Sequence, residues 1–270
     1  MISDSMLDYE TISKGQYFPL YLYNDTAEEK SEGLFANAES GKSAKQDAIS
    51  DAAFRQISES YGGSSITKED LFYYIYGLLH SPEYRERYKD NLSKELPRIP
   101  AVKKFEDFQA FSQAGRDLAH WHLDYETVDC YGVTLVFTAG DKGPQSLKAC
   151  KDEHFYVRKM KFPSKRDPQT KKNVKDKTTV IYNDYITVRD IPLEAYDYVV
   201  NGKSAIEWVM ERQAVTTDKK SSITNDANLW ALETMNNAAY PLELELLLRV
   251  ITVSLETMKI VDGLPKLDID

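Results

Sequence analysis

The 270-residue chain lacks the features that mark disulfide-rich, membrane-spanning or secreted proteins. It has only two cysteines, Cys130 and Cys150, and neither belongs to a C-x-x-C pair, so no disulfide framework or paired-thiol metal site is expected. No apolar run approaches the roughly 18–20 residues that cross a bilayer. The opening MISDSMLDYE has neither the basic nor the apolar part of a secretory signal. These absences predict a reduced, cytoplasmic, globular protein.

The sequence also lacks a catalytic motif in a suitable setting. The stretch ANAESGKS at 36–43 resembles a phosphate-binding loop, but alanine replaces its first glycine and no buried strand leads directly into it. The EEK triplet at 28–30 has the spacing of metal-dependent nucleases but lies in a polar region. In HWH at 120–122 the histidines are two apart on an expected helix, so they cannot share an ion. We therefore predict no catalytic residue, no cofactor-binding residue and no metal ligand here.

Positive charge is scarce except in one segment. The chain has 34 Lys and Arg against 43 Asp and Glu, a net charge of −9, which argues against a polyanionic partner for the chain as a whole. Residues 158–177 nevertheless carry +7, and the other 250 residues carry −16. The cations of this basic segment are Arg158, Lys159, Lys161, Lys165, Arg166, Lys171, Lys172, Lys175 and Lys177. Such a segment can bind a polyanion, although a solvated hairpin tip would look the same.

Hydrophobic periodicity predicts an α+β fold, in which a small, mostly antiparallel sheet is flanked by several helices. We expect helices over 67–80, 82–92, 103–122, 202–215 and 227–237, and a long helix at the C-terminal end over 242–258. Thr67 and Asp70 form a capping box, and Ser81 and Pro82 start the second helix. His80 is expected to be structural, with a cationic form that would suit the helix end.

Strands are expected over 16–24, 131–139, 153–162 and 177–188. The first should be buried, and the last two should pair, so that the basic segment forms the arm and tip of their hairpin. Residues 25–60 are expected to form a poorly ordered polar loop, with a short helix over 44–60 as the alternative.

At YIYGLLHSPEYRERYKDNLSKELPRIP, residues 74–100, the sequence resembles the C-terminal specificity region of type ISP restriction–modification enzymes. These single chains combine nuclease, helicase-like ATPase, methyltransferase and target-recognition parts. The likeness continues in FPLYLYN (18–24), FYVRKMKF (155–162), TTVIYNDYITV (178–188), and the long stretches at 191–228 and 247–265.

The resemblance implies that residues 1–270 form one target-recognition domain, cut from a longer bacterial defence enzyme and without catalytic activity of its own. Its partners would be double-stranded DNA and the upstream adenine methyltransferase and helicase domains of the same polypeptide. S-adenosylmethionine, ATP and Mg²⁺ would belong to those upstream parts, and no cofactor to this one.

Two groups of residues are predicted to contact DNA. Cations of the basic segment would neutralise phosphates, which gives affinity but little sequence information. They are Lys159, Lys161, Lys165, Arg166, Lys171, Lys172 and Lys175. Base edges would be read by polar side chains of the expected hairpin tip and of a second polar loop, which caps a helix if it does not read DNA. These are Arg166, Gln169 and Asn173 in the tip and Lys219, Lys220, Ser221, Ser222 and Asn225 in the loop.

Two other functions stay open at this point. The chain could be an interaction scaffold that couples methyltransferase to motor without reading bases. More remotely, it could be a free-standing nuclease or ATPase that uses Glu28 or Lys42.

Overall fold

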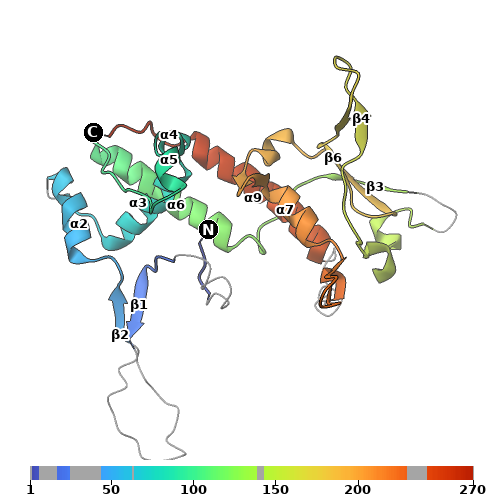
Figure 1. The fold of residues 1–270 in the computed structure, drawn as a ribbon, viewed down its shortest axis with the longest axis horizontal. Coiled ribbons are helices and arrows are strands. Elements are labelled where there is room, and N and C mark those ends of the chain that lie inside the picture. The colour runs from blue at the N-terminus through green and yellow to red at the C-terminus, as the bar shows by residue number, and fades with distance from the viewer. Residues whose placement is uncertain are drawn as a thin grey trace, which may run out of the picture. The chain divides into compact units, whose positions relative to one another are not determined.

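The computed structural model describes residues 2–5, 17–24, 44–62, 64–138, 143–229 and 242–269. The chain divides into two compact units: unit 1 is Met1–Leu123 with Gly263–Asp270, and unit 2 is Asp124–Asp262. Helices and small antiparallel sheets occur in both, which confirms the predicted α+β class (Figure 1). That the two units act as one recognition domain stays a prediction.

Unit 1 is mainly helical and carries one two-stranded sheet. The strands β1 and β2 pair antiparallel, with Tyr21 opposite Asp47. The elements are β1 (Tyr21–Asn24), β2 (Ala44–Asp47), α2 (Asp51–Ser58), η1 (Glu59–Tyr61), α3 (Lys68–His80), α4 (Pro82–Arg87), α5 (Lys89–Leu92) and α6 (Phe105–Leu123).

Helices α3 and α6 form the framework of unit 1 and approach each other closely at two glycines. A Cβ atom on Gly77 would lie 2.2 Å from the Phe111 carbonyl oxygen, and one on Gly115 would lie 1.9 Å from that of Tyr73. The predicted capping box starts α3, because Thr67 and Asp70 each accept the other's backbone N–H. The apolar stripe of the sequence is therefore buried against α6, with Tyr74 and Leu78 fully enclosed.

The extended segment after α5 is held by tyrosine hydroxyls. Tyr84 donates to the Arg98 carbonyl at 2.6 Å, Tyr74 to Pro100 at 2.7 Å and Tyr61 to Val102 at 2.9 Å. The segment's carbonyls thus have partners although its prolines prevent regular secondary structure. These three tyrosine hydroxyls therefore fix the extended segment against the helices of unit 1.

Unit 2 is built on a three-stranded antiparallel sheet in the order β3-β7-β6. Its elements are β3 (Thr134–Phe137), η2 (Leu147–Ala149), η3 (Asp152–Phe155), β4 (Ser164–Arg166), β5 (Asn173–Lys175), β6 (Thr179–Ile181), β7 (Ile186–Arg189), η4 (Leu193–Tyr196), β8 (Val199–Val200), β9 (Lys203–Ser204), α7 (Ala205–Arg212), β10 (Thr216–Thr217), β11 (Thr224–Asn225) and α9 (Leu242–Asp262).

The core of unit 2 lies among this sheet, η4, α7 and α9. Val180 and Val188 of the sheet are fully buried, as are Ile206 of α7 and Leu247 of α9. The long C-terminal helix is confirmed and extends four residues beyond the predicted end. Its apolar face is buried as the periodicity predicted, and it supports the sheet from which the basic segment emerges.

The sheet differs from the prediction in which residues form its strands. Residues 153–162 do not form a strand, apart from a single bridge between Lys161 and Ile181. The predicted strand over 177–188 is instead two strands, β6 and β7, because Asn183 makes a tight turn between them. Its side-chain oxygen accepts the amides of Tyr185 at 2.9 Å and Ile186 at 2.8 Å. The basic segment consequently has its own short hairpin, β4–β5.

Two expectations near the N-terminus are corrected. The strand β1 exists but is not buried, since Phe18 just before it and Tyr23 within it are each 65% exposed. Residues 44–60 form β2, α2 and the start of η1, which corrects the loop interpretation and confirms its short-helix alternative. Residues 25–43, with the phosphate-loop-like and E-x-K stretches, lie outside the described residues.

Candidate nucleic-acid interface

The basic segment folds into a two-stranded hairpin that projects from the sheet of unit 2 (Figure 1). Arg166 pairs with Asn173, and Ser164 pairs with Lys175. Side chains directly opposite each other in an antiparallel pair lie on the same face, so Arg166, Asn173 and Lys175 share one face of the hairpin. Lys165 lies on the other face.

Most cations of the basic segment are not neutralised within the described part of the chain. Lys165 binds Asp176 at 2.9 Å, and Lys177 binds Glu207 at 3.4 Å. Asp176 also accepts the Thr178 hydroxyl, and this bond, with that from Lys165, lowers the pKa of the carboxyl. No described carboxylate pairs with the remaining cations, which are Arg158, Lys159, Lys161, Arg166, Lys171, Lys172 and Lys175. They are exposed and keep the positive charge that a polyanion would meet.

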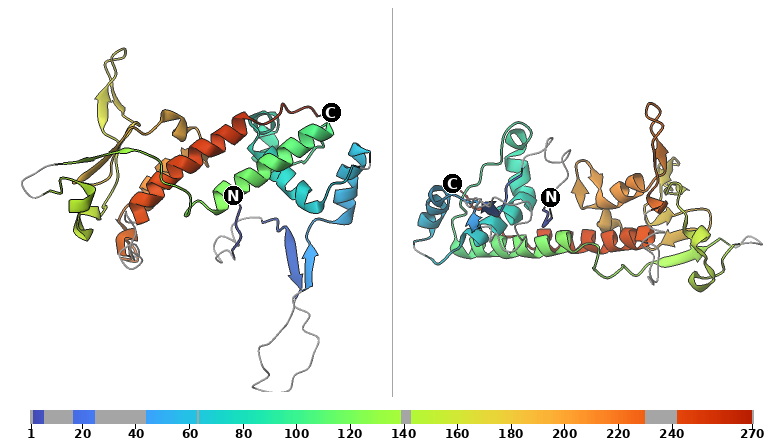
Figure 2. Two further views of the ribbon diagram at one scale, coloured as in Figure 1. Left: turned by 180° about the vertical axis from the view of Figure 1, so that it is seen from behind. Right: turned by 90° about the horizontal axis from the view of Figure 1, so that it is seen from below.

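The second polar loop is also a hairpin, formed by β10 and β11, and it projects from unit 2 as well (Figure 2). Thr216 pairs with Asn225, and Thr217 with Thr224, whose hydroxyls lie 2.9 Å apart. The predicted polar loop is thus a short hairpin. Asp226 takes the capping role that the sequence allowed, because its carboxylate accepts the Asn228 amide at 3.0 Å and residues 227–229 are helical.

Both hairpins are joined to one stretch of chain. The Arg158 carbonyl, at the start of the basic segment, accepts the Val215 amide next to β10 at 3.0 Å. The Asn228 side chain bonds both the amide and the carbonyl of Val157, at 2.8 and 2.9 Å. Because these bonds are largely buried, the bases of the two hairpins are held at fixed positions relative to each other.

The two hairpin tips contain the same six-residue turn, Asp167–Lys172 in one and Asp218–Ile223 in the other. The first amide donates to the sixth carbonyl at 2.8 and 2.9 Å, and the fifth amide donates to the first carbonyl at 3.0 and 2.9 Å. The fifth residue has positive φ in each turn, 57° at Lys171 and 58° at Ser222. The tips are therefore ordered turns rather than irregular loops.

An aspartate organises each turn from its first position. Asp167 accepts the amides of Gln169 and Thr170 at 2.8 and 2.7 Å, and Asp218 accepts those of Lys220 and Ser221 at 3.0 and 2.7 Å. These hydrogen bonds lower the pKa of both carboxyls. In each turn the bond from the third residue after the aspartate has the larger effect, and the bond from the second residue has a smaller one. Sequence reasoning missed both aspartates. The shared pattern of Asp followed three residues later by Thr or Ser could have indicated them.

Every residue predicted to contact DNA is exposed. The residues are Lys159, Lys161, Lys165, Arg166, Gln169, Lys171, Lys172, Asn173, Lys175, Lys219, Lys220, Ser221, Ser222 and Asn225. The structure brings them onto two ordered hairpins of one unit, apart from Lys159 and Lys161, which lie on the segment leading to β4. Their contact with DNA stays a prediction.

A family model for the type ISP C-terminal specificity domain matches residues 1–244. The chain belongs to this family. The family resemblance read from the sequence is thereby confirmed. No curated protein matches this specificity domain.

Solved structures, two of them of type ISP restriction–modification enzymes, resemble the specificity domain over most of its length. LlaBIII, an ATP-dependent type ISP enzyme bound to DNA, is 35% identical, with a TM-score of 0.68 over 93% of this chain. A nuclease-deletion mutant of the type ISP enzyme LlaGI, in complex with a DNA substrate mimic, is 40% identical, with a TM-score of 0.58 over 76%. The DrdV–DNA complex is 32% identical, with a TM-score of 0.61 over 81%.

The specificity domain corresponds to a small part of each of these proteins. It spans 14% of the LlaBIII chain, 14% of the LlaGI chain and 20% of the DrdV chain. The activities of the whole enzymes therefore do not transfer to it directly.

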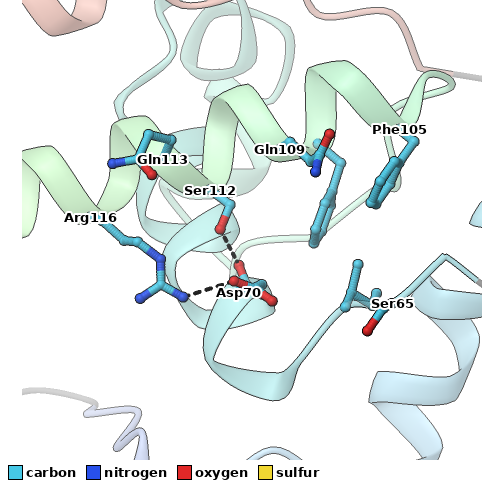
Figure 3. Close-up of a pocket in the computed structure, with 9 residues that line it drawn as sticks. Ser65, Asp70, Phe105, Gln109, Ser112, Gln113 and Arg116 are labelled. Carbon is cyan, nitrogen blue, oxygen red and sulfur yellow. Dashed lines mark hydrogen bonds and ion pairs between the residues drawn. The ribbon is translucent and has the colours of Figure 1, made fainter.

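A pocket of about 170 Å³ between α3 and α6 is a weaker candidate for a binding site (Figure 3). Arg116 on its wall already binds Glu69 and Asp70, each at 2.8 Å, and Ser112 donates to the Asp70 carbonyl at 2.9 Å. Burial alone would raise the pKa of Asp70, but hydrogen bonds from Thr67 and Arg116 outweigh it and lower the pKa. Asp70, Ser112 and Arg116 of the pocket are thus engaged in holding α3 to α6.

The histidines of unit 1 have structural partners. His80 Nδ1 lies 2.8 Å from the Tyr76 carbonyl oxygen, and His122 Nδ1 lies 2.7 Å from the Tyr76 hydroxyl. Burial lowers the pKa of His80, and burial with the nearby His80 lowers that of His122 to about 3. His80 has a structural partner, as predicted, and burial favours its neutral ring over the cationic form that would suit the helix end.

Within the described ranges, no group of three or more His, Cys, Asp or Glu side chains is placed to hold a metal ion. No helix in the described part of the chain has both the length and the apolar character needed to cross a bilayer.

Proposed function

We propose that the chain is a sequence-specific reader of double-stranded DNA within a longer type ISP restriction–modification enzyme. The observation that carries the proposal is the pair of ordered, exposed hairpins on one stretch of chain, the first rich in cations that no described carboxylate neutralises. The specificity-family membership supports it, and so do the solved relatives, which are bound to DNA or to a DNA substrate mimic.

The two hairpins would divide the work of binding. The β4–β5 hairpin concentrates Lys171, Lys172 and Lys175, which suits phosphates and provides affinity that depends strongly on salt. The β10–β11 hairpin presents shorter polar groups, among them Ser222 and Asn225, which suit base edges. A two-stranded ribbon is narrow enough to enter the major groove of B-form DNA.

The chemistry of restriction and modification would lie outside this chain. We assign it no catalytic residue, and we expect the adenine methyltransferase, with its S-adenosylmethionine, upstream in the same polypeptide. The ATP- and Mg²⁺-dependent motor and nuclease would also lie there. The reader would set the position of the target for those domains.

Removing cations from the first hairpin tests the proposal. Replacing both Lys171 and Lys172 by Ala should lower the slope of log affinity against log salt by about 1 for each lost phosphate contact. The slope is measured by titrating the full chain into a fluorescent duplex at several salt concentrations. Lys259→Ala is the matched control, because this exposed lysine of α9 is paired with Glu256 at 3.2 Å.

An unchanged slope in the double variant would count against DNA contact by this hairpin and favour the scaffold alternative. That alternative has some support of its own, because Phe18 and Tyr23 of unit 1 are exposed large aromatic side chains. Such side chains suit a protein partner, and the upstream methyltransferase is the partner we propose for them.

A further inference from the structure

The equivalent turns allow the two hairpin tips to be compared position by position. The sixth position is Lys172 in the β4–β5 tip and Ile223 in the β10–β11 tip. The first of these, Lys172, is a cation, which suits a phosphate contact. The second is a branched apolar residue, and sequence reasoning did not select it.

Ile223 is exposed to an unusual degree. Its 69% exposure is the highest among the large hydrophobic residues of the described ranges. Its backbone completes the turn, because its carbonyl accepts the Asp218 amide at 2.9 Å and its amide donates to the Ser221 hydroxyl at 3.3 Å. Any residue with an amide hydrogen could make these bonds, so the fold does not require the apolar side chain.

The neighbours of Ile223 indicate what it could contact. Lys219, Lys220, Ser221, Ser222 and Thr224 are all exposed and polar, and two of them are cations. A hydrophobic protein surface would leave those cations desolvated and unpaired at considerable cost. Duplex DNA offers phosphates to the cations, and its major groove carries one prominent apolar group, the C5-methyl of thymine.

We propose that Ile223 is a specificity-determining residue that packs against the methyl group of a thymine in the major groove. The inference rests on the proposed function and deepens it, because it assigns the apolar part of base reading to one side chain. The β4–β5 tip, with Lys172 at the same position, supplies charge instead. The two turns thus share one backbone and differ in the chemistry that they present.

The test begins with selection of bound duplexes from a random library by the full 270-residue chain. The enriched duplex is then made with deoxyuridine in place of each thymine in turn, which removes only the methyl group. At one position, wild-type affinity should fall about fourfold, the effect of losing one buried methyl contact. Ile223→Ala should bind the thymine and deoxyuridine duplexes equally well. Leu193→Ala, which changes an exposed leucine of η4 in the same unit, should discriminate like the wild type.

The other possible results distinguish failure of the proposed function from failure of the inference about Ile223. If the wild-type chain enriches no sequence, the proposed function itself fails, and this inference fails with it. If the wild type selects a sequence but ignores every thymine methyl, or if Ile223→Ala keeps the discrimination, only this inference is overturned. The inference is also overturned if Ile223→Ala binds both the thymine and the deoxyuridine duplex more weakly than the wild type does, by the same factor. The side chain would then act by another contact, such as insertion between base pairs.

Discussion

Lys171 and Ser222 show how single residues shape the candidate interface. Both adopt a backbone conformation that costs a residue other than glycine roughly 1–2 kcal/mol. The aspartate at the start of each turn offsets part of this cost through bonds to two amides. Strain retained at the same place in two exposed turns suggests that these side chains serve a purpose besides folding.

Lys171→Gly separates the side chain from the turn. Glycine adopts positive φ freely, so we expect the hairpin to keep its shape and the free energy of unfolding to stay within about 1 kcal/mol of wild type. Duplex affinity should nevertheless fall, because a cation is lost. Fluorescence anisotropy gives the affinity, and amide exchange of Lys172 and Asn173 reports the turn. Wild-type affinity in Lys171→Gly would show that the charge of Lys171 plays no part.

The individual contact residues were partly predictable from the sequence. Exposure of the lysines in the basic segment follows from their charge density, since uncompensated cations are rarely buried. The role of Asp167 and Asp218 could not be read from charge, because two aspartates in basic or polar stretches look like simple counter-charges. Ile223 escaped notice because one apolar residue in a polar loop gives no periodic signal.

At the scale of elements, the close pair α3 and α6 leaves no room for an added methyl group at the centre of unit 1. The backbones approach so closely at Gly77 and Gly115 that an added methyl group would overlap a carbonyl oxygen. Side chains of the neighbouring turns can then interdigitate, as Tyr74 and Phe108 do with ring centroids 4.7 Å apart.

Gly115→Ala should destabilise unit 1. Alanine normally favours a helix over glycine, but here the methyl group would force the helices apart, which costs about 1–3 kcal/mol. Amide exchange in α3 and α6 under increasing urea measures this loss for unit 1 alone. The control Ala110→Gly, on the exposed face of α6, should cost only about 0.5–1 kcal/mol. A Gly115→Ala chain as stable as this control would contradict the close approach.

Long helices were the elements best predicted from sequence, and the short strands were the worst. The stripes of α3, α6 and α9 repeat over several turns and so give a strong signal. The strands β4, β5, β10 and β11 have two or three residues each and no apolar alternation, because they pack against no core. Turn chemistry fixes their pairing, and the Asp-x-x-Thr/Ser pattern of each tip is a weaker signal than a periodic apolar stripe.

For the molecule as a whole, the division into two units was not visible in the sequence. The boundary at residue 123 is the end of α6, and the run that follows it contains no proline or glycine before Gly132. Residues 263–269 return to unit 1, where the Lys103 amide donates to the Asp268 carbonyl at 2.9 Å. Such a return is a long-range contact, which local patterns do not encode. Both candidate hairpins fall in unit 2, so DNA reading is proposed for that unit.

Removing both hairpin tips from the full chain tests whether these tips read duplex DNA. Residues 167–172 and 218–223 are each replaced by Asn-Gly, a pair that forms two-residue turns and keeps the flanking strands paired. We expect the wild type to enrich a defined sequence from a random duplex library, and the shortened chain to fold but to enrich none. The control, Lys89→Ala with Lys259→Ala, removes two lysines paired with carboxylates elsewhere and should select as the wild type does. Enrichment of the wild-type sequence by the shortened chain would show that the hairpin tips do not read the DNA sequence.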